Sequence, residues 1–432
     1  MSAKKMKEGK KPLQKIMLAT LAMSLLSAIP FSSQAAPGDR ERAKRIHDRI
    51  AGVPPTAAVL DAMEACITGN SAVCIAGGGD PTISTDGAVV AAYVAMENSS
   101  FYNVTLKNFA APWTNEAQTV FVPLNDYTAT VIGMIRDDLD FRGILSDDII
   151  YIGSTTTPGY RNNDNTHYTT MENAGKDLKT ELVRRTQTAV TGIPAAAGIF
   201  SLRASARAFY IDGTNRAMFR FTLMNHLCTD LEPLKDNSRA HDRVRQDVTR
   251  SPGGDSRLFM NSCVGCHAGM DPLAQALAYY EWSYTTDPDT GQLTYSTTQR
   301  AVDPNDSSKG MTRAQPKYLI NSGNFKYGYV TRNDSWDNYW RSGPNAILGW
   351  SSSVASSGQG ASSMGRELAN SKAFSSCQAR KVFQNVCLRD PMSNAADRTK
   401  INQIVNSMTN GVVNMKRIFA ETASYCKDGS QY

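Results

Sequence analysis

The sequence predicts a mainly α-helical, multidomain protein with minor β-hairpins. Most of its long segments carry apolar residues at the spacing of one helical face and stop at glycine or proline. The alternating pattern of strands is confined to short stretches between residues 293 and 332. Finally, 432 residues with ordinary apolar content and few low-complexity tracts suffice for two or three packed domains.

Residues 1–35 predict a secretory signal peptide. Six lysines precede an apolar run at 16–29, and Ser33-Gln34-Ala35 puts small residues at the two positions that a signal peptidase reads. The run is too short for a stable bilayer anchor, and a buried helix of a cytosolic protein would need a polar face that it lacks. We therefore expect cleavage after Ala35, a periplasmic mature protein and no stable membrane insertion.

The net charge belongs mostly to this leader. The whole chain carries 46 Lys and Arg against 40 Asp and Glu, or +6, whereas residues 1–35 hold six Lys and one Glu, which leaves the mature chain at +1. A charge so close to zero removes the compositional argument for nucleic-acid binding or for an anionic membrane surface.

Residues 36–192 are expected to form an N-terminal helical domain. An aromatic, proline-containing loop at 109–123 divides it. Apolar periodicity and glycine stops predict helices at 40–52, 56–69, 88–98 and 127–138.

The motif Cys263-Val264-Gly265-Cys266-His267 is the attachment pattern of a c-type haem. Two thiols three residues apart reach the two vinyl groups on one haem edge, and the following imidazole ligates the iron. Zinc would need a fourth ligand, with a second pair of ligands at short spacing, and none is visible. A thioredoxin-like dithiol would need a strand before the motif and gives His267 no role. The sequence therefore predicts one covalently attached haem c, with Cys263, Cys266 and His267 as its binding residues.

The segment after the motif predicts a helix that begins at Asp271. Asp271 is a good N-cap and Pro272 a good first helical residue, and residues 273–280 place apolar side chains on one helical face. Five arginines precede the motif, and one or two of them are candidates to pair with haem propionates, the rest lying in a solvated loop. They are Arg239, Arg243, Arg245, Arg250 and Arg257.

These residues resemble the cytochrome c-like domain of multidomain proteins first catalogued in planctomycetes. The resemblance rests on the motif at 263–267, the following Met-Asp-Pro-Leu at 270–273 and a turn at 287–291, and it extends more weakly over 193–390. Ala274 stands where that family usually has glycine. The resemblance implies haem attachment at Cys263, Cys266 and His267. It also implies a cytochrome c-like haem domain at 193–320 and a small C-terminal helical domain at 321–432.

Downstream of the motif, short strands are expected at 293–302 and 325–332, where polar and apolar residues alternate. The Ser/Gly-rich stretch 351–363 predicts a linker. Residues 374–387 predict one continuous helix.

The six cysteines outside the motif suit disulfide formation in an exported protein. Gly69-Asn70 predicts a turn that brings Cys66 and Cys74 together. A helix over 374–387 would separate Cys377 and Cys387 by about 15 Å, beyond the reach of a disulfide. We therefore expect the pairs Cys387–Cys426 and Cys228–Cys377.

No spacing rule identifies the ligand on the far side of the iron. Met311 lies in a loop 44 residues after His267, where many small c-type domains place a thioether, so it is the expected metal ligand beside His267. Met364 is the alternative, and His226 or His241 would make a bis-histidine site of lower potential.

The sequence thus predicts single-electron transfer between periplasmic redox partner proteins by an exported monohaem c-type cytochrome. A haem enzyme with an open sixth position, peroxidase-like, remains an alternative, as does a binding protein with an accessory haem domain. Electron transfer is preferred because no distal acid and base are recognisable near the motif. No G-x-S-x-G, phosphate-loop or H-E-x-x-H motif indicates another enzyme class.

Overall fold

The computed structural model describes residues 38–211, 213–298, 301–302, 311–312, 316–408 and 411–428. From Asp39 onward the chain forms one compact unit. The predicted signal peptide and its cleavage site at Ala35 lie outside the described residues.

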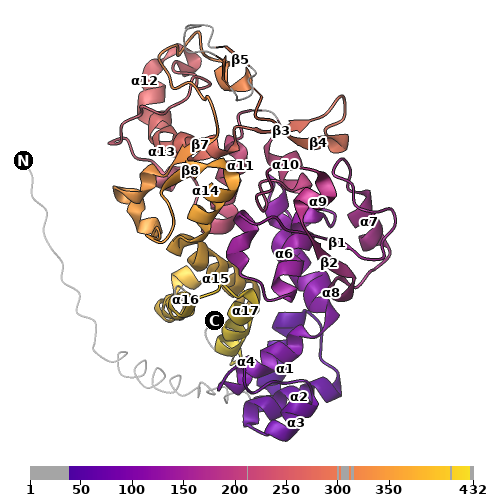
Figure 1. Cartoon of the computed structure of the whole chain (residues 1–432). Coiled ribbons are helices and arrows are strands. Elements are labelled where there is room, and N and C mark those ends of the chain that lie inside the picture. The colour runs from indigo at the N-terminus through magenta and orange to yellow at the C-terminus, as the bar shows by residue number, and fades with distance from the viewer. Residues whose placement is uncertain are drawn as a thin grey trace, which may run out of the picture. The chain divides into compact units, whose positions relative to one another are not determined.

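Helices dominate the described chain, which confirms the predicted fold class (Figure 1). Short 3-10 and π segments connect many of the α-helices. The first half of the chain contains α1 (Asp39–Ala51), α2 (Ala57–Thr68), α3 (Ser71–Ala76), α4 (Gly87–Met96), α5 (Lys107–Ala110), α6 (Asp126–Arg136), α7 (Thr166–Asn173), α8 (Leu178–Glu181), α9 (Gln187–Thr191), α10 (Arg203–Phe209) and α11 (Arg216–Thr222). The second half contains α12 (Ser256–Leu258), α13 (Val264–Ala274), α14 (Gly360–Ala369), α15 (Lys372–Cys387), α16 (Ala395–Met408) and α17 (Met415–Cys426).

The strands of the described chain pair in twos, and every pair is antiparallel. The 287–291 segment turns the chain between the two strands of the second pair, as its sequence predicted. The pairs are β1 (Ile150–Gly153) with β2 (Leu182–Arg185), β3 (Tyr280–Ser283) with β4 (Gln292–Tyr295), β5 (Ala301–Val302) with β6 (Met311–Thr312), and β7 (Ser335–Asp337) with β8 (Ser357–Gln359).

The four helices predicted in the N-terminal segment are present as α1, α2, α4 and α6. Local capping explains their bounds: the Thr56 hydroxyl accepts the backbone N–H of Val59 at the start of α2, and Gly69 ends it with a left-handed φ of 81°. The Asp86 carboxylate caps α4 in the same way. These signals are local, so the sequence alone predicts them.

The three predicted segments pack against one another within the compact unit. Helix α17 of the C-terminal segment contacts α1 and α4 of the N-terminal one, and it also contacts α15 (Figure 1). One large hydrophobic core contains buried residues from Ala43 to Ala423. A second, small cluster consists of Val244, Val248, Phe259 and Val264, beside the Cys263–His267 motif.

The helix around the motif differs from the prediction. It begins at Ser256, runs through a π segment at Phe259–Cys263 and ends with α13 at Ala274, so Asp271 is not its N-cap. Pro272 lies in the last turn of α13, where its missing N–H removes only one late hydrogen bond. Residues 275–277 continue as a 3-10 turn, and Tyr280 starts β3.

Two further expectations are wrong. Residues 325–332 form turns with a single bridge at Tyr329, because this segment pairs with one short stretch of backbone only. The Ser/Gly-rich stretch 351–363 is not a linker over its full length, since β8 and the first residues of α14 lie within it. Trp336 on β7 holds this region by donating to the Ser363 hydroxyl at 2.7 Å.

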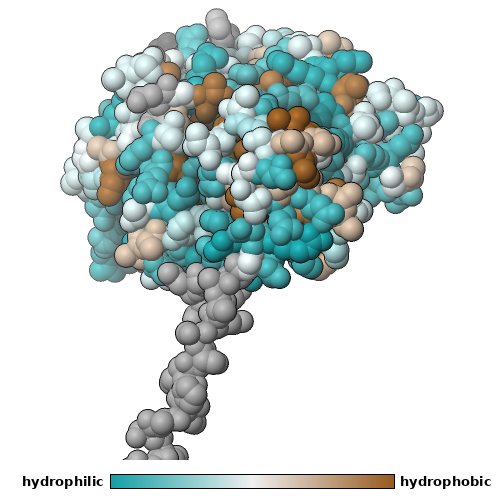
Figure 2. All heavy atoms as spheres, turned by 90° about the horizontal axis from the view of Figure 1, so that it is seen from below, coloured by the Kyte–Doolittle hydropathy of each residue, from teal (hydrophilic) through white to brown (hydrophobic). Residues whose placement is uncertain are grey.

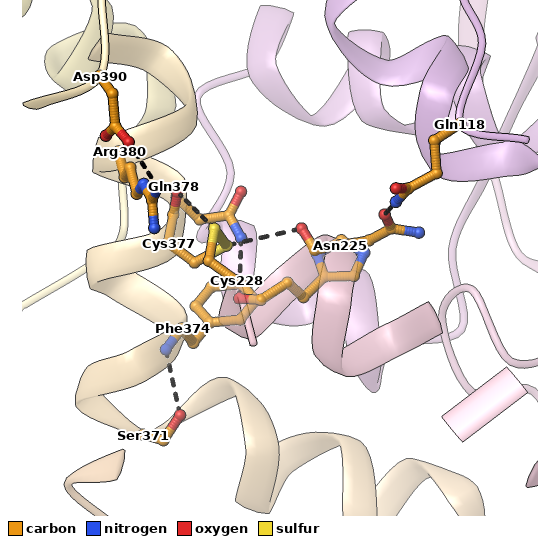
Figure 3. Close-up of a disulfide and its surroundings, with 10 residues drawn as sticks. Gln118, Asn225, Cys228, Ser371, Phe374, Cys377, Gln378, Arg380 and Asp390 are labelled. Carbon is orange, nitrogen blue, oxygen red and sulfur yellow. Dashed lines mark hydrogen bonds and ion pairs between the residues drawn. A yellow bond between two sulfur atoms is a disulfide. The ribbon is translucent and has the colours of Figure 1, made fainter. Parts of the chain in front are cut away.

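The three predicted disulfides are present: Cys66–Cys74, Cys228–Cys377 and Cys387–Cys426. Residues 377 and 387 both lie on α15, so the helix keeps them apart as predicted. The second bridge joins the end of a π segment at Leu223–Leu227 to α15 (Figure 3). The disulfide prediction is therefore confirmed in its pairing as well as its number.

The face of the molecule in Figure 2 is largely hydrophilic, and its hydrophobic residues lie in small separate groups. Within the ranges that the structure describes, no helix combines the length and the apolar character needed to cross a membrane.

Candidate functional site

The Cys263–His267 motif lies where the π segment passes into α13. Both thiols are half-buried and free, whereas the other six cysteines of the chain are paired. Cys263 ends the π segment and Cys266 lies in the first turn of α13, three residues later. The motif therefore presents two free thiols within about one turn of helix, in a chain whose other cysteines form disulfides.

The two thiols have different surroundings. Cys263 packs against the small apolar cluster that contains Val244 and Phe259. The Cys266 thiol donates to the backbone carbonyl of Leu231 at 3.6 Å, and burial raises its pKa. The Cys266 thiol is therefore not activated as a thiolate, which is the state that a nucleophilic redox dithiol needs.

The His267 ring is oriented by Asp271, one turn later on α13. Its Nδ1 atom lies 3.1 Å from Oδ1 and 3.2 Å from Oδ2 of this carboxylate. An ionised carboxylate only accepts hydrogen bonds, so this contact requires a proton on Nδ1 of the ring. The side chain is 19% exposed, so the protein does not fully enclose the ring.

Asp271 belongs to a buried four-residue ion network. Arg216 donates to its two oxygens at 2.8 and 3.0 Å and to those of Asp247 at 2.9 and 2.8 Å. Arg245, fully buried, pairs with Asp247, and its backbone N–H donates to Asp271 at 3.3 Å. Burial alone would raise the pKa of Asp271, but Arg216 and, to a smaller extent, His267 and Arg245 hold this pKa well below its usual value. Asp271 is therefore an anion beside the imidazole.

Close packing fixes α13 in the unit. Helix α13 contacts α11 and β7. At Gly269 a Cβ would fall inside the indole ring of Trp340, so only glycine allows this approach. Helix α11 begins at Arg216, and its contact with α13 brings the guanidinium to Asp271.

A cavity of about 680 Å³ lies beside the motif, within the size range of small-molecule and cofactor sites. Val244 and Phe325, which pack with Cys263, belong to its wall. Two backbone hydrogen bonds hold the opposite walls together, from Tyr329 to Val244 at 2.9 Å and from Gln246 to Tyr329 at 3.0 Å. His241 and Arg250 add polar groups to the lining.

Arg250 differs from the other arginines that precede the motif. Its guanidinium lies over the rings of Phe259, at 4.6 Å, and Phe325, at 4.0 Å, and burial lowers its pKa. Among the described residues no carboxylate pairs with it. The other four are paired: Arg239 with Asp236, Arg243 with Asp337, Arg245 with Asp247, and Arg257 with Asp255.

The candidate distal ligands lie in different places. Met311 lies on β6, and its side chain is outside the described part of the structure. Met364 is fully buried in α14, and His226 is fully buried with its Nε2 atom 2.6 Å from the Tyr127 hydroxyl. Of the three candidates whose side chains the structure describes, only His241 lines the cavity beside the motif.

Within the described ranges there is no group of three or more His, Cys, Asp or Glu side chains that could hold a metal ion. The segment before the motif is helical, whereas a thioredoxin-like dithiol follows a strand.

The sequence missed two features of this site. Asp271 was predicted to be a helix N-cap, because Asp271-Pro272 matches a helix start. Its role in the ion network could not be predicted, since its partner Arg216 lies 55 residues upstream. The sequence did not distinguish Arg250 from the other four arginines, because the carboxylates that pair with those four are brought to them by the fold. Comparisons of the chain with protein-family models, with curated proteins and with solved structures found no match.

Proposed function

We propose that the chain is an exported monohaem c-type cytochrome that transfers single electrons between periplasmic redox partner proteins. In this proposal Cys263 and Cys266 bind the haem covalently and His267 ligates its iron. The observation that carries the proposal is the pair of free thiols three residues apart, followed directly by a partly exposed imidazole whose Nδ1 faces a carboxylate. The resemblance of residues 193–390 to planctomycete-type cytochrome c-like domains is part of the same proposal.

The residues around the motif fit such a group. Apolar side chains of the 244–264 cluster and Phe325 supply a nonpolar wall next to Cys263. Arg250, which pairs with no carboxylate of the described residues, supplies a cation for an acidic substituent and is held over two aromatic rings. A bound haem supplies an iron that changes its charge by one electron, and the chain's own residues bind and orient it.

The oxidised cysteines support export. Three disulfides persist in oxidising compartments and are rare in the cytosol. Attachment of haem c takes place after export, where the two motif thiols would have to escape oxidation. The leader predicted at residues 1–35 agrees with this route.

The test is an optical spectrum of the protein purified from a periplasm with an active c-type maturation system. We expect reduction with dithionite to give the sharp α and β bands of a low-spin haem, and denaturing gels to retain the stain of a covalent haem. A wild-type protein without covalent haem would refute the proposal.

The position of His241 favours keeping the haem enzyme as the second candidate. This imidazole and Arg250 line the same cavity, so a base and a cation are available near a small oxidant. Carbon monoxide distinguishes the two functions, because it binds ferrous iron only at an open position. A ferrous spectrum unchanged by carbon monoxide supports electron transfer, and a rapid shift supports the enzyme.

We expect Arg250→Ala to lower the midpoint potential. Removing a nearby cation stabilises the more positive ferric state over the ferrous one, because like charges repel. The ratio of oxidised to reduced haem at a set potential should therefore rise severalfold. The measurement is a spectroelectrochemical titration.

The matched control is Arg257→Ala. Arg257 comes from the same segment but is 84% exposed in its side chain and paired with Asp255. The Arg257→Ala substitution should leave the ratio of oxidised to reduced haem within about twofold of that of the parent. Equal shifts in the two variants would remove Arg250 from the haem site.

A further inference from the structure

We propose that Asp271 is a positioning residue that sets the orientation of His267 and its electron donation to a bound metal, through the buried network of Arg216, Asp247 and Arg245. This inference rests on the proposed haem site. It assigns a role to residues that the motif does not contain.

Asp271 cannot turn away from His267 without losing other bonds. Its side chain is fully buried and accepts two hydrogen bonds from Arg216 and one from the backbone of Arg245. Arg216 is itself held by both oxygens of Asp247. The carboxylate is thus fixed from three directions, and it points its oxygens at Nδ1 of the ring.

The network also keeps the carboxylate charged in a buried place. Two guanidiniums, of Arg216 and Arg245, face two carboxylates, of Asp247 and Asp271, so the four groups are neutral together. Removing one partner of such a buried set leaves an uncompensated charge. A simple surface hydrogen bond to His267 would not require this arrangement.

A carboxylate on Nδ1 changes what Nε2 does. Hydrogen bonding from a metal-bound imidazole to an anion fixes its tautomer and makes it a stronger donor, and loss of such partners typically changes metal affinity or activity by 10–100-fold. Stronger donation stabilises the ferric over the ferrous state. We infer that Asp271 lowers the reduction potential of the haem bound at His267.

The experiment compares Asp271→Asn with Asp247→Asn in the full-length matured protein. Both variants remove one buried carboxylate from the same two arginines, but only Asp271 contacts His267. We expect Asp271→Asn to raise the ferrous-to-ferric ratio about tenfold at a set potential, which is 59 mV for one electron. Asp247→Asn should raise it by a smaller factor, because Asp247 acts on the ring only through Arg216 and Asp271. Equal shifts, or none, would overturn the proposal.

A second readout does not need the haem. Nitrogen-15 NMR of the full chain made without the maturation system reports which ring nitrogen of His267 carries hydrogen. In the parent protein we expect the hydrogen on Nδ1 of His267. This measurement needs no variant, so it stands even if a variant does not fold. A hydrogen on Nε2 and none on Nδ1 would overturn the role of Asp271. A chain that never carries haem would refute the proposed function, whereas the tautomer would still decide the role of Asp271.

Discussion

A chain with Cys263→Ser and Cys266→Ser together is expected to lose all covalent haem. Each thioether needs a thiol sulfur, and a serine hydroxyl does not replace it, so the double variant retains haem only by noncovalent contacts. Each single variant keeps at most one bond and should lose stable attachment. Because both thiols are half-buried and free, we expect the fold to lose no more than about 1 kcal/mol.

Haem staining after denaturing electrophoresis measures the loss. The matched control is Cys66→Ser with Cys74→Ser, which also removes two cysteines but breaks a disulfide far from the motif in sequence. We expect this control to stain like the parent. A haem stain on the double motif variant would contradict the assignment of the two thiols. So would a control protein that shows no haem stain.

The parts of the fold that local signals determine were predicted from the sequence. Helix α2 begins at a threonine cap and ends at a left-handed glycine, and both signals lie within its own residues. Helix geometry excluded a bond between Cys377 and Cys387, because both lie on α15. The pairing of Cys377 with Cys228 and of Cys387 with Cys426 was a preference that the structure confirms.

The candidate site was predicted only in part, because distant contacts override local signals there. Asp271-Pro272 has the chemistry of a helix start, yet the helix begins at Ser256 and Asp271 is used by Arg216 and Arg245. A cap needs only its own helix, whereas an ion network needs residues from three separate segments. Sequence spacing therefore revealed the thiols and the imidazole but not the carboxylate that orients the imidazole.

The cavity beside the motif was also predictable only in part. The apolar character of Val244 and Phe325 is visible in the sequence, but their meeting depends on hydrogen bonds between backbone segments more than eighty residues apart. Likewise, all five arginines before the motif look alike in the sequence. Only the fold separates Arg250, which lies over two aromatic rings, from the four that carboxylates pair.

Removing the Cys228–Cys377 disulfide is expected to destabilise the chain most among its three bridges. In the chain-entropy model a cross-link restricts the unfolded chain more as its loop lengthens, and a loop of 149 residues corresponds to about 5 kcal/mol. The bridge between Cys66 and Cys74, with a separation of 8, corresponds to about 2.5 kcal/mol. The long loop encloses the whole of the motif and the cavity.

Loop length is isolated by comparing two double variants. One carries Cys228→Ala and Cys377→Ala, and the other carries Cys66→Ala and Cys74→Ala. Each pair buries at least one sulfur almost completely, so the packing losses are similar. Around the long bridge, Ser371 caps α15 by accepting the backbone N–H of Phe374 (Figure 3). Gln378 donates to the backbone carbonyl of His226, and we expect both contacts to remain without the disulfide. Urea unfolding followed by far-ultraviolet circular dichroism should give a loss about 2 kcal/mol larger for the 228–377 pair. An equal or smaller loss for that pair would show that native-state contacts, and not the length of the enclosed loop, determine what this bridge contributes.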